Sequence, residues 1–212
     1  MNVQNALPTR TIEAARLTCR RGERLLFEGV GFTVVPGELL LLRGPNGVGK
    51  TTLLSALAGL LRPDAGAISV SGRGEEDRPG DDLHLMGHQP AIKARLTAAE
   101  NLNFWADLFG GDRKLVAPAL ERVGLKHVAG LEAGHFSAGQ TRRLALGRLL
   151  VADRPIWLLD EPTAALDGEG EQLVIALLDA HLKRGGIAVA ATHHDIHIPP
   201  PAKVRTLTLV PA

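Results

Sequence analysis

The sequence predicts an α/β fold built on a parallel β-sheet, and three observations carry this prediction. Three short runs are continuously apolar, as expected of strands buried on both faces of a parallel sheet: residues 39–42, 156–159 and 187–191. Segments of helical character separate these runs, which is the alternation typical of α/β proteins. A glycine-rich loop lies directly between the first run and the helix that follows it.

The first part of the chain is expected to be β-structure. Short β-prone runs within residues 11–35 end at Pro36-Gly37, which is a turn signal before the first buried strand. The helix after the glycine-rich loop is expected to run from Lys50 to about Leu60, because a proline and a glycine follow soon after.

Three consecutive helices are expected between the first two buried strands. Thr97 and Glu100 are spaced as a capping box, which opens a helix that runs to residue 109. Asp112 and Ser137 are expected to begin two more helices, which end near residues 123 and 152. This succession predicts a helical lobe inserted between strands of the core. A last helix is expected over residues 168–184.

Composition excludes several classes of function. The 212 residues carry 24 Lys and Arg against 23 Asp and Glu, so no net field favours nucleic acid or an anionic membrane. Aromatic residues make up only 3%, which excludes a base-stacking platform. The single cysteine, Cys19, excludes an internal disulfide framework. Because no apolar run approaches the ~18 residues of a membrane span and Met1–Arg10 has no signal-type stretch, a protein of a reducing compartment is expected.

The glycine-rich loop fits the phosphate-binding pattern G-x-x-x-x-G-K-[ST] at every fixed position. Its glycines allow backbone N–H groups to converge on phosphate oxygens, and the following helix N-terminus adds a positive dipole. Lys50 is expected to reach the β- and γ-phosphates, and the Thr51 hydroxyl to ligate Mg²⁺. The alternative is a glycine-rich turn with an incidental lysine. The expected nucleotide-binding residues here are Gly44, Pro45, Asn46, Gly47, Val48, Gly49, Lys50, Thr51 and Thr52.

Two carboxylates follow the second apolar run. If this strand is a parallel neighbour of the phosphate-loop strand, Asp160 and Glu161 lie near the phosphates at the carboxyl edge of the sheet. Asp160 is then expected to hold Mg²⁺, and Glu161 to orient and deprotonate the attacking water. The alternative is a solvated acidic turn. His193 follows the third run, where it is either a contact of the γ-phosphate or a surface residue at a strand end.

His193, His194, Asp195 and His197 also suggest a metal site. Three consecutive prolines at positions 199–201 prevent a helix from aligning the last two histidines, so a solvated tail is the preferred interpretation.

Six motifs in order resemble those of ABC-transporter ATPases. Residues 136–140 read FSAGQ, which is similar to the signature sequence of that family. The phosphate loop and Gln89 precede it, and the Asp160-Glu161 strand, residues 164–167 and His193 follow it. The resemblance implies a P-loop NTPase of the ABC type, with a parallel-core sheet flanked by helices, a small antiparallel β part and an inserted helical lobe. It implies one domain over 11–212, with a core lobe at about 11–88 and 153–212 and a helical lobe at about 89–152.

The same resemblance implies an active site shared by two subunits. In this family two ATPase subunits pair head to tail, and the signature of each closes the nucleotide site of the other. Ser137, Gly139 and Gln140 are therefore expected to bind nucleotide in trans, with Ser137 catalytic. Gln89 is expected to be catalytic and to bind Mg²⁺ together with Thr51 and Asp160.

Three residues depart from the family pattern. Ala138 replaces a glycine of the signature, which implies that a positive φ is not needed there. Ala164 replaces the usual serine and removes one hydrogen bond across the dimer. Arg21 occupies the position where the family places an aromatic ring on adenine, and its guanidinium plane is expected to bind the nucleotide instead.

Within the family, the chain most resembles the ATP-binding subunits that serve cytochrome c maturation. Its short length and the segments 39–54, 96–105, 137–143 and 157–160 carry this resemblance. It implies an ATPase that needs ATP and Mg²⁺ and powers haem export or the release of a haem-loaded chaperone. It also implies a separate CcmB-like permease, an ATP-dependent homodimer, no nucleic acid, and a peripheral place on the cytoplasmic face of the inner membrane. The alternative is a subunit of another small ABC transporter, for amino acids, lipoproteins or cofactors.

Overall fold

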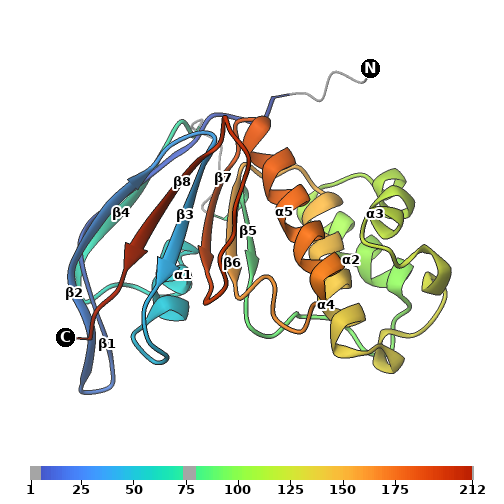
Figure 1. Ribbon diagram of the computed structural model, residues 1–212, viewed down its shortest axis with the longest axis horizontal. Helices are drawn as coiled ribbons and strands as arrows, with labels where there is room; N and C mark the ends of the chain where they lie inside the picture. The colour runs from blue at the N-terminus through green and yellow to red at the C-terminus, as the bar shows by residue number, and fades with distance from the viewer. Residues whose placement is uncertain (1–5, 74–79, 212) are drawn as a thin grey trace.

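The computed structural model describes residues 6–73 and 80–211, which form two β-sheets with helices on both faces of the larger one (Figure 1). The first five residues of the segment Met1–Arg10 lie outside the described residues, as do positions 74–79 and 212 of the expected domain. Within the described ranges, no helix is long and apolar enough to cross a bilayer.

The larger sheet has five strands in the order β5-β6-β7-β3-β8, and every neighbouring pair is parallel. This confirms the predicted parallel core. Its strands are β3 (Glu38–Arg43), β5 (Leu83–Met86), β6 (Ile156–Asp160), β7 (Ile187–Ala191) and β8 (Lys203–Thr208).

The smaller sheet is antiparallel, in the order β2-β1-β4. It contains β1 (Thr11–Arg21), β2 (Arg24–Val34) and β4 (Ala65–Ser71). A tight turn joins the first two strands, and Gly22 within it adopts φ 60°, a conformation that glycine takes without strain. The small antiparallel part of the predicted fold is thereby confirmed.

Side chains of the parallel strands alternate between two apolar layers. In β3, Leu40 and Leu42 pack with the antiparallel sheet and with α1 (Lys50–Leu57), which lies between the two sheets (Figure 1). Leu39 and Leu41 pack on the opposite side, in a second layer. Helix α1 ends about three residues before the expected position, because the chain takes a left-handed conformation at Gly59 (φ 73°).

The second layer holds all of the remaining helices. Both expected capping boxes are present: Thr97 with Glu100, and Ser137 with Gln140. The helix expected from Asp112 begins with a 3₁₀ turn capped by its side chain. The elements are α2 (Ala98–Phe109), α3 (Val116–Arg122), α4 (Ala138–Gly147) and α5 (Gly168–Lys183), with 3₁₀ turns at Arg113–Leu115, Lys126–Val128, Ala133–His135 and Arg148–Leu150.

One condition of the sequence analysis is not met, and one of its interpretations holds only in part. Strand β6 does not lie next to the phosphate-loop strand β3, because β7 pairs with both and separates them. The tail is not simply solvated: its histidines are exposed, but Ile196 and Ile198 are buried and β8 extends the sheet. Strand β8 is an edge strand whose side chains are mostly exposed, so it lacks the apolar run that marks the central strands.

A buried carboxylate ties the two sheets together. Asp82, just before β5, accepts hydrogen bonds from Arg10 (3.1 Å) and from two nitrogens of Arg73 (2.8 and 2.9 Å), which flank the antiparallel sheet. Burial alone raises the pKa of Asp82, but the hydrogen bonds and charges of Arg73 and Arg10 outweigh it and hold the pKa below its usual value.

We expect Asp82→Asn to lower the free energy of unfolding by about 3 kcal/mol at pH 7, because it leaves two guanidinium groups without their carboxylate. Since the folded pKa is depressed, the advantage of the wild type is complete above the unfolded pKa of about 4 and is lost as the pH falls through the folded pKa. Urea unfolding at pH 7 and pH 3.5 measures it. The matched control is Asp81→Asn at the exposed neighbouring carboxylate, and an equal effect of both substitutions would contradict the prediction.

Candidate functional site

The phosphate loop joins β3 to α1 in a conformation that depends on its glycines. Gly44, Gly47 and Gly49 have φ values of 135°, 77° and 112°, and Gly49 caps α1. A Cβ atom at Gly49 would lie 2.9 Å from the ring of Phe27, so the space there is closed to a larger residue. Lys50 Nζ donates to the carbonyl oxygens of Gly44 (2.7 Å) and Pro45 (3.3 Å), which holds the ammonium group inside the loop.

A cavity of about 500 Å³ opens over this loop. Ten of the residues predicted from sequence line it: Arg21, Asn46, Gly47, Gly49, Lys50, Thr51, Thr52, Asp160, Glu161 and His193. Gly44, Pro45 and Val48 do not line it, and Val48 is buried in the core beneath. Gln89 does not line it either: it is exposed, and its neighbour His88 faces the cavity instead.

The hydroxyl group of Thr51 donates a 2.7 Å hydrogen bond to Asp160 Oδ2. Asp160 is buried at the end of β6, a strand that contacts α1 directly. These two side-chain oxygens beside a phosphate loop fit Mg²⁺, which prefers oxygen ligands. Water and substrate phosphate normally fill its other coordination positions. Among the described residues, no group of three His, Cys, Asp or Glu side chains is placed to hold a metal ion by itself.

Glu161 and His193 meet at the carboxyl edge of the sheet. Glu161 has a φ of 48°, which is unusual for a residue with a side chain, and its N–H donates to the Ala191 carbonyl (2.7 Å). Its Oε2 accepts from the backbone N–H of His193 (3.4 Å). The Nε2 atom of His193 lies 3.2 Å from Lys50 Nζ and 2.8 Å from Asn46 Oδ1. A carboxylate, a cation and a histidine thus surround the mouth of the phosphate loop.

Two arginines of the antiparallel sheet also line the cavity. Arg21 and Arg24 are paired across the β1–β2 turn, and Leu26 follows on the same strand. Guanidinium planes can stack on a nucleotide base and can attract its phosphates. The four lining residues that sequence reasoning missed are Arg24, Leu26, His88 and Ala164. The hairpin register could have found Arg24, because residues flanking a two-residue turn lie opposite each other.

The signature residues lie in a different cavity. Ser137, Gly139 and Gln140 line it together with Arg143 and residues 165–167, and none of these lines the cavity of the phosphate loop. Ser137 caps α4 by accepting from the N–H of Gln140 (3.2 Å). Ala138 is not among the residues with a positive φ, as its replacement of glycine predicted. Within one chain, the signature and the phosphate loop are therefore separate surfaces.

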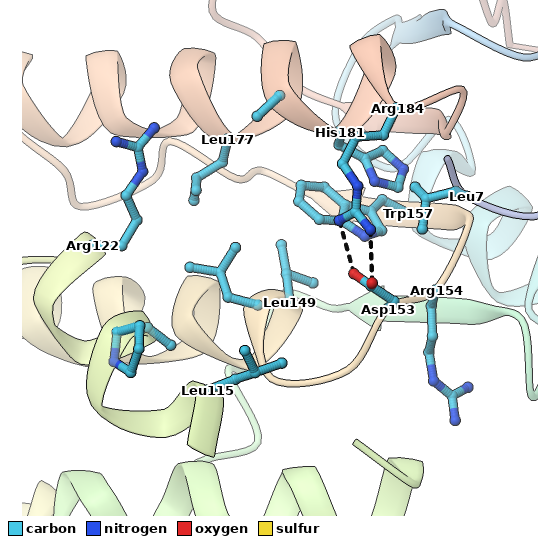
Figure 2. Close-up of a pocket in the computed structure, with 14 residues that line it drawn as sticks. Leu7, Leu115, Arg122, Leu149, Asp153, Arg154, Trp157, Leu177, His181 and Arg184 are labelled. Carbon is cyan, nitrogen blue, oxygen red and sulfur yellow. Dashed lines mark hydrogen bonds and ion pairs between the residues drawn. The ribbon is translucent and has the colours of Figure 1, made fainter. Parts of the chain in front are cut away.

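A third cavity, of about 410 Å³, lies between α3, α5 and β6 (Figure 2). Leu115, Leu149 and Leu177 give it apolar walls. Among its polar groups, Arg154 donates to the backbone carbonyls of Gly80 and Leu83. Arg184 donates to both oxygens of Asp153 (2.8 and 2.7 Å).

The imidazole beside this cavity is a packing group. His181 stacks on Trp157 with 3.9 Å between ring centroids, and burial lowers its pKa to about 4. The ring is therefore neutral at pH 7, and none of the phosphate-loop residues lines this cavity.

Comparisons with known proteins agree with this geometry. Residues 27–164 match the family model described as ABC transporter. The chain is 50% identical over 183 residues to the cytochrome c biogenesis ATP-binding export protein CcmA of Rhodopseudomonas palustris, covering 86% of this chain and 91% of that protein. Its identity to the protein of the same name from Rhizobium meliloti is 48% over 188 residues, with the same coverage.

Solved structures show the same fold. An ABC transporter ATP-binding protein of Pyrococcus furiosus superposes with a TM-score of 0.79 at 22% identity, covering 94% of this chain and 97% of that one. The ATP-binding cassette MJ0796, as a dimer bound to ADP and Pi after hydrolysis, gives 0.76 at 25% identity, covering 86% and 88%. The phosphate loop, the Asp160-Glu161 pair and His193 meet at one sheet edge, and the chain belongs to the ABC transporter family, as an ATP-binding subunit that hydrolyses ATP.

Proposed function

We propose that this ATPase powers a membrane transporter of cytochrome c biogenesis, driving haem export or the release of a haem-loaded chaperone. The observation that carries the proposal is the identity of about half of all aligned residues to proteins named for that role, over nearly the whole length of both chains. The membrane subunit of such a transporter binds the substrate. The role of this chain is to couple ATP hydrolysis to conformational change in that subunit.

The chemistry is assigned to residues at the mouth of the phosphate loop. The loop and Lys50 bind the phosphates of ATP, and Thr51 with Asp160 holds Mg²⁺, which neutralises phosphate charge when bound. Glu161 is the general base for the attacking water, and His193 positions the γ-phosphate beside it. Arg21 contacts the base end of the nucleotide, and Thr52 lines the phosphate end.

The separation of the signature from the phosphate loop supports a site shared by two chains. In an ATP-dependent homodimer, Ser137, Gly139 and Gln140 of one subunit face the nucleotide on the other. The N-terminus of α4 is suited to this, since its dipole and its N–H groups attract phosphate. The proposed domain spans residues 11–212, with lobes at about 11–88 plus 153–212 and at about 89–152.

A CcmB-like permease on the cytoplasmic face of the inner membrane completes the proposed complex, in which this subunit is peripheral. Gln89 and the segment after it join the two lobes and are the proposed route by which nucleotide is sensed there. Asn101 braces this segment, because its buried side chain bonds to the backbone of Lys93 in both directions (2.8 and 3.0 Å). Another small ABC transporter would use the same ATPase chemistry with a different permease.

We expect Glu161→Gln to lower kcat by about 10²–10⁴-fold, because the amide cannot accept the proton of the attacking water. The affinity for nucleotide is expected to be unchanged, and the ATP-bound dimer should accumulate, because it closes but does not hydrolyse its ATP. Phosphate release and size-exclusion chromatography with ATP measure both. The matched control is Glu169→Gln, at an exposed glutamate on α5. Hydrolysis at the rate of the control would remove Glu161 from the role of base.

Ser137→Arg is expected to abolish hydrolysis while leaving nucleotide binding by the monomer intact, because its target phosphate lies on the partner. Mixing it with Lys50→Ala chains should restore some activity, since one site of the mixed dimer then carries both lesions and the other carries neither. Thr97→Arg removes the equivalent capping box of α2 and controls for helix stability. Equal loss in this control, or loss of nucleotide binding by the Ser137→Arg monomer, would contradict the shared site.

In cells, replacement of the native protein by Glu161→Gln is expected to leave apocytochromes c without covalent haem while b-type haem proteins form normally. Haem staining after denaturing electrophoresis detects the difference, since only covalently bound haem survives. Cells with Glu169→Gln should show every c-type band. A full set of bands in the Glu161→Gln cells would retain the ATPase and discard the role in cytochrome c biogenesis.

A further inference from the structure

Arg142 is a buried cation that binds the backbone behind the catalytic carboxylates. Its side chain, from the second turn of α4, is 5% exposed. Its Nη2 atom donates to the carbonyl oxygens of Asp160 (2.6 Å) and Glu161, and its Nε atom donates to that of Pro162 (3.4 Å). One guanidinium group therefore holds three consecutive carbonyls of the turn that follows β6.

This turn contains the strained residue of the site. Glu161 is held at φ 48°, a region that residues with side chains occupy only where their surroundings fix them. The Ala191 carbonyl binds its N–H from one side, and Arg142 binds its carbonyl from the other. Together these bonds set the direction in which the Glu161 carboxylate leaves the backbone.

The guanidinium of Arg142 is buried, which disfavours its charged form. Burial lowers the pKa of its guanidinium, and the negative charges of Asp160 and Glu161 partly offset this. A fourth hydrogen bond runs from Nη1 to the carbonyl of Gly87 (3.4 Å), at the end of β5. A planar group with five donors can serve several carbonyls at once, which an apolar side chain of similar length cannot do.

The same short helix carries the signature. Ser137 caps α4 at its exposed end, and Arg142 lies one turn further along, against the catalytic turn. The Arg142 side chain therefore links the helix that begins after Ser137 directly to the backbone carbonyl of Glu161.

We propose that Arg142 is a positioning residue that orients Glu161 for catalysis and makes this orientation depend on engagement of the signature of its own subunit with the nucleotide of the partner. The inference rests on the proposed role of Glu161 as the base. It assigns to Arg142 no contact with ATP: the residue acts only through the backbone carbonyls that it binds. Within one subunit, Arg142 connects the signature, which faces the nucleotide of the partner, to Glu161, which acts on the nucleotide of its own subunit.

The test substitutes Arg142 by methionine, which has similar reach and no donors, and by lysine, which keeps the charge but not the planar fork. Arg142→Met is expected to lower kcat by about 10–100-fold with KM and nucleotide affinity within about twofold of wild type, as displacement of a catalytic group by ~1 Å does. Arg142→Lys is expected to recover part of the loss, with a kcat between the two.

The matched control is Arg154→Met. Arg154 is also buried and also donates to backbone carbonyls, those of Gly80 and Leu83, but it lies away from the catalytic turn. Its substitution is expected to lower the melting temperature while kcat per folded molecule stays unchanged. If Arg142→Met does not fold, Arg142→Lys and the control decide: a kcat for Arg142→Lys equal to wild type overturns the proposal.

Accumulation of the ATP-bound dimer distinguishes a positioning role of Arg142 from a merely structural one. Arg142→Met leaves Lys50 and Ser137 in place, so the dimer should form with ATP and accumulate, as for Glu161→Gln. A fall in kcat accompanied by loss of the dimer would mean that the substitution damages α4 itself, and would overturn the proposal. Normal ATP hydrolysis by Glu161→Gln would overturn the proposed role of Glu161 as the base. Normal hydrolysis by Arg142→Met, with Glu161→Gln inactive, would overturn only the proposed role of Arg142.

Discussion

The whole site depends on three parallel strands that end at the same edge of one sheet. Strand β3 delivers the phosphate loop, β6 delivers Asp160 and Glu161, and β7 delivers His193. Because these strands are buried, most of their side chains are apolar, and the polar groups that face the phosphate loop lie at the strand ends or just after them. The 2.7 Å bond from Thr51 to Asp160 forms only because the strands are in this alignment.

The elements that pack on the two faces of the parallel sheet are held in different ways. Helix α1 lies between two sheets, so the phosphate loop at its start is fixed to both of them. Helix α4 lies on the other face among helices, and it meets the sheet edge through Arg142 and backbone carbonyls. The phosphate loop is thus held between two sheets, whereas helix α4 packs on one sheet face only, through Leu144 and its neighbours, and reaches the catalytic turn through Arg142.

Strong local signals made most of the fold predictable. The apolar runs predicted β3, β6 and β7, the capping boxes predicted α2 and α4, and the phosphate-loop pattern predicted six of the cavity residues. Strands β4, β5 and β8 escaped because they are short or half exposed, so they carry no apolar run. The place of β6 in the strand order was not predictable because pairing is decided by packing between distant segments, which no local pattern records. His88 was missed for the same reason, whereas the hairpin register could have located Arg24.

The pairing of β3 also fixes when the nucleotide site can form. Both neighbours of this strand, Ile187–Ala191 and Lys203–Thr208, are near the opposite end of the sequence. Their contacts have a high contact order, and a chain emerging from the ribosome cannot make them until those late residues have been synthesised. A nascent chain that already contains the complete phosphate loop therefore has no ordered strand to support it. Nucleotide binding in this protein therefore has to await the synthesis of residues 187–208, whose strands flank the phosphate-loop strand.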